Sequence, residues 1–439
     1  MVFLQKIQNK KIAIYGMGKS GVATAKKLTS LKAKIYCWDD NASIRKKIKK
    51  LKYPINKFWV KESKEAIDYI VISPGIDINK CKIKKYLKKN NKIIITDLDI
   101  FFKLNKNIPV ISITGTNGKS TTCKIIEKIL QTAGYNTTTG GNIGNPVLSI
   151  KKSGKKNIFI LEISSYQLQY SKVFRSNHAA ILNISADHLE RHKNISNYIK
   201  IKSKIFFAQK SKDYFYINST NKFSKSIENI FKAKKIKSRL QKVNSNKSKI
   251  LLKKINNKLF KSKGNIENLA FAYKIAKNLK INDSIIIKAL NKFKGLPHRQ
   301  EVFLKNNNFT FVNDSKATSF DATHQSLSTY NKIYWIVGGL SKYKDRFDLK
   351  EISKNIIKAY IIGKNTSFFA NQIRKKINHT ISYNLKNAIK NILYDVKKHN
   401  LKNCTILLSP AAASYDQFNN FEERGNSFKN LVIKNFKIN

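Results

Sequence analysis

Short apolar runs alternate with segments of helical periodicity along most of the chain. The runs at 11–16 (KIAIYG), 157–164 (NIFILEIS) and 332–339 (KIYWIVGG) have the composition of buried strands, and each ends at glycine or polar residues. Segments such as 121–130 (TTCKIIEKIL) follow strands and carry apolar positions at helical spacing. Strands that alternate with helices predict an α/β fold with parallel sheets. Such sheets bind ligands at the carboxyl ends of their strands.

Turn residues divide the alternating strands and helices into several α/β segments. One segment begins after Pro109, and another begins after the Gly/Pro pair of 295–297. Single hydrophobic cores stop growing near ~250–300 residues, so a chain of 439 residues should split into two to four domains.

A glycine-rich turn, TGTNGKST (114–121), connects a buried strand to a helix. Glycines let backbone N–H groups approach phosphate oxygens, Lys119 adds positive charge, and the hydroxyl of Ser120 or Thr121 can hold Mg²⁺. The general phosphate loop has four residues between its first glycine and Gly-Lys, whereas this chain has two. An ordinary strand–turn–helix is the alternative, and the lysine with two hydroxyls disfavours it.

A second glycine turn, GMGKSG (16–21), follows the first strand and precedes a helix and a strand that ends at Asp39. This spacing is typical of a dinucleotide site, so an NAD-type ligand is one hypothesis. A nucleotide-like fold that binds another phosphate-bearing ligand, or none, fits the same pattern. The strand 68–76 (DYIVISPGI) ends in a further tight turn, Ser73-Pro74-Gly75, where α/β folds place ligands.

Acidic and histidine residues follow two strands downstream of the phosphate loop. Glu162 ends the strand 157–164, a position from which a carboxylate can reach the Mg²⁺ of a nucleotide. His188, Glu190 and His192 follow the next strand. Their spacing matches no usual zinc motif, so a zinc site is the less favoured alternative.

The formal net charge of +60 raises the question of nucleic acid or an anionic membrane as partner. The excess is nearly all lysine and runs from Lys6 to Lys437, without the defined arginine-rich and aromatic region of nucleic-acid readers. We therefore expect neither partner. Four dispersed cysteines, no signal peptide and no apolar run of ~18 residues predict free thiols in a cytoplasmic protein.

Seven motifs resemble those of the Mur ligase family, and the resemblance covers essentially the whole chain. They are TGTNGKST (114–121), GGNIG (140–144), LEISSYQL (161–168), ADHLERH (186–192), GLPHR (295–299), NDSKAT (313–318) and SPAAASYDQFNNFEERGNSF (409–428). The short phosphate loop is normal in this family. The closing motif, with Ser73-Pro74-Gly75, is similar to the branch that adds D-glutamate.

The resemblance implies an ATP-dependent amide ligase with three domains. These are a Rossmann-like UDP-sugar-binding domain (1–106), a central P-loop-type ATPase domain (107–296) and a Rossmann-like amino-acid-binding domain (297–439). The resemblance also implies that the N-terminal glycine turn binds a uridine nucleotide instead of NAD. The implied substrates are ATP, UDP-N-acetylmuramoyl-L-alanine and D-glutamate, the implied cofactor is a pair of Mg²⁺ ions, and a monomer is expected.

The resemblance also assigns residues to each ligand. ATP would be bound by Gly115, Thr116, Asn117, Gly118, Lys119, Ser120, Thr121, Asn265, Asn268, Arg299 and Asp314. The UDP-sugar would be bound by Gly16, Met17, Gly18, Ser20, Gly21, Asp39, Ser73, Pro74, Gly75 and Asn142. D-Glutamate would be bound by Thr318, Lys342, Ser414 and Phe421. The metal ligands would be Ser120, Glu162, His188 and Lys202, with Lys119, His188 and Lys202 catalytic.

Lys202 aligns with a lysine that family members carry as a carbamate, whose oxygens, unlike an ammonium, can bind Mg²⁺. Without the resemblance, Lys202 would be taken for a solvated lysine on an amphipathic helix. Three positions differ from the usual family residues: Gly264 replaces histidine, Ser319 replaces asparagine and Tyr343 replaces glycine.

Overall fold

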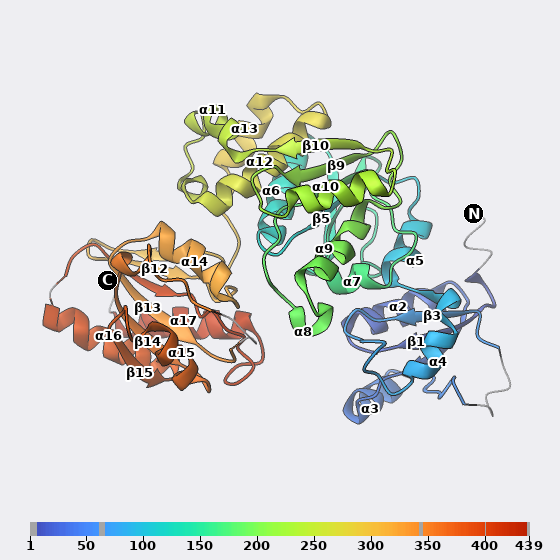
Figure 1. Ribbon diagram of the computed structural model, residues 1–439, viewed down its shortest axis with the longest axis horizontal. Coiled ribbons are helices and arrows are strands. Elements are labelled where there is room, and N and C mark those ends of the chain that lie inside the picture. The colour runs from blue at the N-terminus through green and yellow to red at the C-terminus, as the bar shows by residue number, and fades with distance from the viewer. Residues whose placement is uncertain (1–6, 61–65, 342–345, 400, 437–439) are drawn as a thin grey trace. The chain divides into compact units, whose positions relative to one another are not determined.

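The computed structural model describes residues 7–60, 66–341, 346–399 and 401–436. The described residues form a mixed α/β fold with three sheets (Figure 1). They divide into two compact units, unit 1 (Met1–Asn257 with Ile266–Phe293) and unit 2 (Lys258–Asn265 with Lys294–Asn439). The predicted α/β class is confirmed.

The first sheet of unit 1 has the strand order β2-β1-β3-β4, and all its strands are parallel. Its strands are β1 (Lys11–Tyr15), β2 (Lys34–Trp38), β3 (Tyr69–Ile72) and β4 (Ile94–Ile95). The accompanying helices are α2 (Lys19–Ser30), α3 (Ala42–Lys50), α4 (Lys84–Lys89) and α5 (Asp97–Leu104). The strands expected within 11–16 and 68–76 are therefore present, and each stops where its glycine turn begins.

The second sheet of unit 1 has the order β10-β9-β8-β5-β7-β6 and is also parallel throughout. Its strands are β5 (Val110–Thr114), β6 (Asn136–Gly141), β7 (Asn157–Glu162), β8 (His178–Ile181), β9 (Tyr214–Asn218) and β10 (Arg239–Val243). The helices after β5 are α6 (Lys119–Thr132), α7 (Ser165–Gln169), α8 (Leu189–His192), α9 (Ile195–Ser203), α10 (Ser224–Ala233), α11 (Lys249–Lys253), α12 (Lys263–Asn278) and α13 (Asp283–Asn291). β5 and β7 are buried at every position, as their apolar runs require.

The sheet of unit 2 has the order β11-β12-β16-β13-β14-β15, with β11 antiparallel at one edge. Its strands are β11 (Glu301–Lys305), β12 (Phe309–Asn313), β13 (Ile333–Gly338), β14 (Ile356–Ile362), β15 (His379–Tyr383) and β16 (Cys404–Leu408). Its helices are α14 (Phe320–Thr329), α15 (Thr366–Ile373), α16 (Leu385–His399) and α17 (Phe421–Asn435). Single turns of 3₁₀ helix lie at Asn91–Ile93, Lys204–Phe206, Ser245–Ser248, Lys258–Lys261 and Ser353–Asn355.

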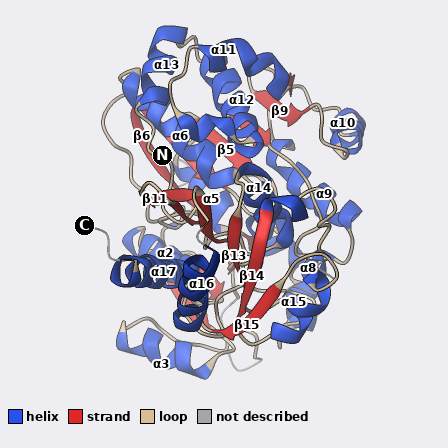
Figure 2. Ribbon diagram, turned by 90° about the vertical axis from the view of Figure 1, so that its left-hand side faces the viewer, coloured by secondary structure: helices blue, strands red, loops and turns tan. Residues whose placement is uncertain are grey.

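Helices cover both faces of this third sheet. Side chains of α14 and α15 pack with one set of buried strand residues, and side chains of α16 and α17 pack with the alternate set. Figure 2 shows β13, β14 and β15 side by side, with α15 on one side and α16 and α17 on the other. Alternation of side chains along each strand explains the two separate cores.

The central strands of the second sheet determine where the chemistry lies. β8, β5 and β7 are neighbours and parallel, so the turns after them meet at one edge of the sheet. These turns contain the phosphate loop, Glu162 and the segment that leads to His188. Strand order therefore joins three motifs that are far apart in the sequence.

The structure also tests the expectations for the cysteines and for membrane-spanning helices. All four cysteines are free thiols, as predicted, and Cys37, Cys123 and Cys404 are buried. Among the described residues, no helix combines the length and the apolar character that a membrane crossing needs.

Candidate active site

The phosphate loop joins β5 to α6 and has a conformation that requires glycine at Gly118. The φ of Gly118 is +83°, and an added Cβ would lie 2.1 Å from Oδ1 of Asn268 on α12. The Lys119 ammonium donates to the carbonyl oxygens of Gly115 at 2.9 Å and of Thr116 at 2.8 Å. Lys119 thus lies over the loop in which phosphates are predicted to bind.

Asn183 supports this loop from the segment that follows the neighbouring strand β8. Its Oδ1 accepts the backbone N–H of Asn117 at 2.8 Å, and its carbonyl oxygen accepts the N–H of Thr116 at 3.0 Å. The hydroxyl of Thr116 in turn accepts the N–H of Ser185 at 3.0 Å. Sequence reasoning missed Asn183, although a polar residue directly after a buried strand could have indicated it.

Glu162 ends β7 and is 3% exposed. The Ser120 hydroxyl donates to its Oε2, and the Asn142 amide donates to its Oε1 at 2.7 Å. The predicted metal ligands Ser120 and Glu162 are therefore brought together. Asn142 is predicted to bind the UDP-sugar, and in the structure its amide contacts the carboxylate of Glu162.

Lys202 on α9 is 2% exposed, so the alternative interpretation as a solvated helix lysine is wrong. Its ammonium donates to the carbonyl oxygen of Gly115 at 2.9 Å and to the Thr114 hydroxyl at 3.2 Å. It also lies 4.8 Å from the ring centre of Tyr198. Burial, followed by the charge of Lys119, holds the pKa of Lys202 well below its usual value.

His188 lies at the start of α8 with a left-handed φ of +54°. Its Nδ1 lies 3.0 Å from the Tyr166 hydroxyl, and its Nε2 lies 3.4 Å from Asp187. Burial raises the pKa of Tyr166 to about 12, so the phenol stays protonated near neutral pH. The hydroxyl can therefore donate to His188.

His192 is fully buried and does not join His188 in a metal site. Its Nε2 lies 2.9 Å from the Ser165 hydroxyl, and burial lowers its pKa to about 4, which makes it a neutral packing residue. The described residues contain no cluster of three or more His, Cys, Asp or Glu side chains suited to a metal ion. The zinc alternative finds no support in this part of the chain.

The two glycine turns of the N-terminal sheet lie against each other. The Ser73 hydroxyl donates to the carbonyl oxygen of Gly16 at 2.5 Å, and a Cβ on Gly21 would lie 2.0 Å from the same oxygen. Asp39 accepts the backbone N–H of Met17 at 2.7 Å and that of Asn41 at 2.9 Å. Asp39 therefore fixes the conformation of the first turn, which also contains Gly18 and Ser20 at the start of α2.

The arginine of GLPHR and the aspartate of NDSKAT interact within unit 2. Asp314 accepts bonds from Ser326 at 2.6 Å, Ser409 at 2.8 Å and the N–H of Gln300 at 3.1 Å. Burial raises the pKa of Asp314 to about 6, against the opposing effects of these hydrogen bonds and of the charge of Arg299. Asn265, also in unit 2, donates to the carbonyl oxygen of Leu259 at 2.8 Å.

The predicted D-glutamate residues come from three segments of unit 2. Thr318 precedes α14, Ser414 follows β16, and Phe421 begins α17. Lys316 places its ammonium 3.6 Å from the ring centre of Phe421. Lys342 lies outside the described residues, as does Tyr343.

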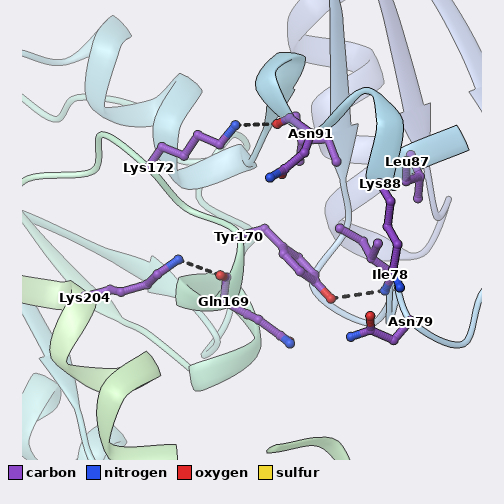
Figure 3. A pocket seen from close by; sticks show the side chains of 10 residues that line it. Ile78, Asn79, Leu87, Lys88, Asn91, Gln169, Tyr170, Lys172 and Lys204 are labelled. Carbon is purple, nitrogen blue, oxygen red and sulfur yellow. Dashed lines mark hydrogen bonds between the residues drawn. The ribbon is translucent and has the colours of Figure 1, made fainter. Parts of the chain in front are cut away.

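A cavity of about 410 Å³ lies where the two sheets of unit 1 meet (Figure 3). Lys172 donates to the carbonyl oxygen of Asn91 at 2.6 Å, and Lys204 donates to that of Gln169 at 2.6 Å. The Tyr170 hydroxyl accepts the N–H of Ile78 at 3.1 Å across the same junction. The contacts of Lys172 and Tyr170 join the segments of the two sheets, whereas the bond of Lys204 lies within the segments of the second sheet. No predicted site residue lines the cavity.

Comparison with known proteins identifies the family of this chain. Residues 113–286 match the Mur ligase middle domain, and residues 10–95 match the Mur ligase MurD-like N-terminal domain. A UDP-N-acetylmuramoylalanine--D-glutamate ligase of Rickettsia bellii is 36% identical over 449 residues, which cover 98% of each protein. The chain belongs to the Mur ligase family. The like-named protein of Clostridioides difficile is 35% identical and covers 97% of this chain and 99% of its own length.

Solved structures of Mur ligases share this fold. UDP-N-acetylmuramate-alanine ligase from Thermotoga maritima gives a TM-score of 0.57 at 15% identity over 97% of this chain and 99% of that protein. A pseudomurein peptide ligase type C from Methanothermus fervidus gives 0.56 at 19% identity over 98% and 100%. The resemblance drawn from motifs is thus confirmed at the level of family and fold.

Proposed function

We propose that this chain is an ATP-dependent ligase that joins D-glutamate to UDP-N-acetylmuramoyl-L-alanine during the synthesis of peptidoglycan precursors. Full-length similarity to ligases of that name carries the proposal. The second support is a phosphate loop, a carboxylate and a buried lysine at one sheet edge, within the part that matches the middle domain.

The reaction follows from the poor reactivity of a carboxylate. In the first step the substrate carboxylate takes the γ-phosphoryl group of ATP, which forms an acyl phosphate and ADP. In the second step the D-glutamate amine attacks the acyl carbon, and phosphate leaves as the amide forms. Lys119, poised over the loop, would neutralise phosphate charge during the first step.

The donor set at Glu162 suits Mg²⁺, because carboxylate and hydroxyl oxygens are hard ligands. Mg²⁺ uses one or two carboxylates together with substrate phosphates, so the lack of a larger acidic cluster in the described part of the chain fits this metal. Ser120 and Glu162 would hold one ion, and His188 with the carbamate of Lys202 would serve a second. The ions would stabilise the negative charge that accumulates on the phosphoryl group.

Carbamylation of Lys202 is supported by its surroundings. An amine reacts with CO₂ only when it is neutral, and burial favours the neutral form of Lys202. The product would carry a negative charge beside Lys119, the cation that now disfavours protonation of Lys202. The modification would therefore replace a neutral amine by an anion that the Lys119 cation attracts.

The three substrates would occupy three domains, for which we propose the ranges 1–106, 107–296 and 297–439. Each range contains one complete sheet. The contacts of Gly16 with Ser73 support a UDP-sugar site, and the packing of Asn268 on the phosphate loop supports a role for Asn268 near ATP. We propose that the enzyme acts as a monomer in the cytoplasm.

The deciding experiment measures phosphate release from ATP in the presence of UDP-N-acetylmuramoyl-L-alanine. Parallel reactions receive D-glutamate, L-glutamate, L-alanine, diaminopimelate or no amino acid. We expect multiple turnover only with D-glutamate, and a product heavier than the UDP substrate by one glutamyl residue. Equal release without amino acid, or a preference for another one, would contradict the proposal.

A further inference from the structure

Arg424 is the largest charged side chain in the described interior, although no predicted function involves it. It lies in α17, three residues after Phe421, and is 1% exposed. Its Nε donates to the Ser315 hydroxyl at 3.0 Å, and its Nη2 donates to the carbonyl oxygens of Ser315 at 2.8 Å and Ala412 at 3.0 Å. The guanidinium thus joins α17 to the turns after β12 and β16.

The third nitrogen of Arg424 faces a fourth segment. A Cβ built on Gly339, just after β13, would lie 3.4 Å from Nη1. Nη1 itself is buried and has no hydrogen-bond partner among the residues that the structure describes. Ser315 closes the arrangement from the other side, because its hydroxyl donates to the carbonyl oxygen of Phe421 at 2.9 Å.

Burial of the charged Arg424 guanidinium costs free energy of folding. Within the described residues no carboxylate is hydrogen-bonded to the guanidinium, and burial lowers the pKa of Arg424 to about 10. The residue also lies near the amino-terminal end of α17, where the helix dipole disfavours a cation. The charge of Asp416 offsets part of this cost, and the three hydrogen bonds of the guanidinium fix the turns that it contacts.

The segments that Arg424 joins are those that carry the predicted D-glutamate residues. Thr318 follows the Ser315 turn by three residues, Ser414 follows Ala412 by two, and Phe421 begins the helix of Arg424 itself. We propose that Arg424 is the positioning residue of the amino-acid acceptor site, which holds these turns in the register that recognises a dicarboxylic amino acid.

The inference rests on the proposed function, because it assigns the acceptor site to unit 2. Arg424 acts through Ser315 and Ala412 and does not need to touch the substrate. The three bonds of Arg424 come from two nitrogens held in one rigid plane. A lysine keeps the positive charge, but its single nitrogen cannot take the place of both. Arg424→Lys therefore separates the geometry from the charge.

The test uses full-length enzyme and follows phosphate release while D-glutamate is varied. For Arg424→Lys we expect a rise of at least tenfold in KM for D-glutamate, with KM for ATP and for the UDP substrate within twofold of wild type. Hydroxylamine, which traps the acyl phosphate without D-glutamate, should give hydroxamate at a wild-type rate. The matched control is Arg374→Lys, the same change at an exposed arginine, which should alter none of these values.

A merely structural role would lower the melting temperature and the active fraction while KM for D-glutamate stays the same. If Arg424→Lys does not fold, Ser315→Ala removes the shared hydroxyl and should raise KM for D-glutamate about threefold to fivefold. Wild-type KM values in every folded variant would overturn the proposed role of Arg424 and leave the proposed function intact. A wild-type chain without D-glutamate-dependent turnover would instead overturn the proposed function, and this inference with it.

Discussion

At the scale of single residues, burial gives ordinary side chains unusual chemistry. Lys202 is the clearest case, since the sequence around it is that of an amphipathic helix, and the structure buries its amine against the phosphate loop. An exposed lysine one residue before a helix end would be protonated and inert. The same residue inside the protein has a lowered pKa and donates to Gly115 of the phosphate loop.

We expect Lys202→Ala to fold normally and to lose at least a hundredfold in kcat, because it removes a proposed metal ligand from the phosphoryl-transfer site. Lys200→Ala, an exposed lysine on the same helix, is the matched control and should keep wild-type activity. Circular dichroism and steady-state phosphate release check both variants. Turnover of Lys202→Ala near that of wild type would contradict the role.

Asp97 at the start of α5 is buried, and its Oδ2 has no hydrogen-bond partner among the described residues. Burial raises its pKa to about 7, above the ordinary value of 3.8. A raised pKa contributes stability that is complete below the unfolded value and is lost as pH rises through the folded value. Asp97 should therefore weaken the fold progressively between about pH 4 and pH 7.

Asp97→Asn should remove this dependence. Between pH 5 and pH 8 we expect the variant to gain about 2–3 kcal/mol relative to wild type, two pKa units at 1.36 kcal/mol each. Thermal unfolding of both proteins at the two pH values checks the difference. A stability difference that stays constant with pH would show that Asp97 is ionised throughout.

At the scale of elements, α5 connects the two sheets of unit 1 through one carboxylate. Asp99 completes the capping box of α5 by accepting from Thr96, and its Oδ1 accepts the backbone N–H groups of Lys172, Val173 and Phe174. The Ser171 hydroxyl donates to the same oxygen at 2.8 Å. One side chain therefore satisfies a helix terminus and the loop after α7 together.

We expect Asp99→Ala to destabilise unit 1 by about 2–4 kcal/mol, because several buried donors lose a charged acceptor at once. Hydrogen exchange should speed up in residues 171–174. Asp283→Ala, at the exposed first turn of α13, removes an acid of the same kind and should change stability by less than about 1 kcal/mol. Similar effects of both substitutions would argue against a special role of Asp99.

At the scale of the whole molecule, 86 basic and 26 acidic residues produce a formal charge of +60, and the lysines are dispersed along the sequence. We expect DNA binding to be weak at physiological salt, steeply salt-dependent and indifferent to sequence, since dispersed lysines contact phosphates only. Titration of labelled duplexes of different sequence between 50 mM and 200 mM salt checks this. A nanomolar, sequence-selective complex at physiological salt would overturn it.

Much of the fold and part of the site could be predicted from the sequence. Apolar runs and glycine turns placed β1, β5, β7 and the phosphate loop, because local hydrophobicity and φ restrictions are readable residue by residue. Strand β15 carries little local signal, since only Ser382 in it is buried and pairing with β14 decides it. The family followed from motif content, and the comparisons confirmed it.

The sequence by itself determined which residues have the chemistry to bind phosphate and metal, because side-chain type and local spacing follow directly from the order of the residues. Only the tertiary structure decided which of them meet. The order β8-β5-β7 brings Asn183, the phosphate loop and Glu162 to one edge. Burial of Lys202 and Arg424 was decided by the tertiary structure as well, since the cost of a buried ionisable group depends on neighbours from distant segments that no local pattern records.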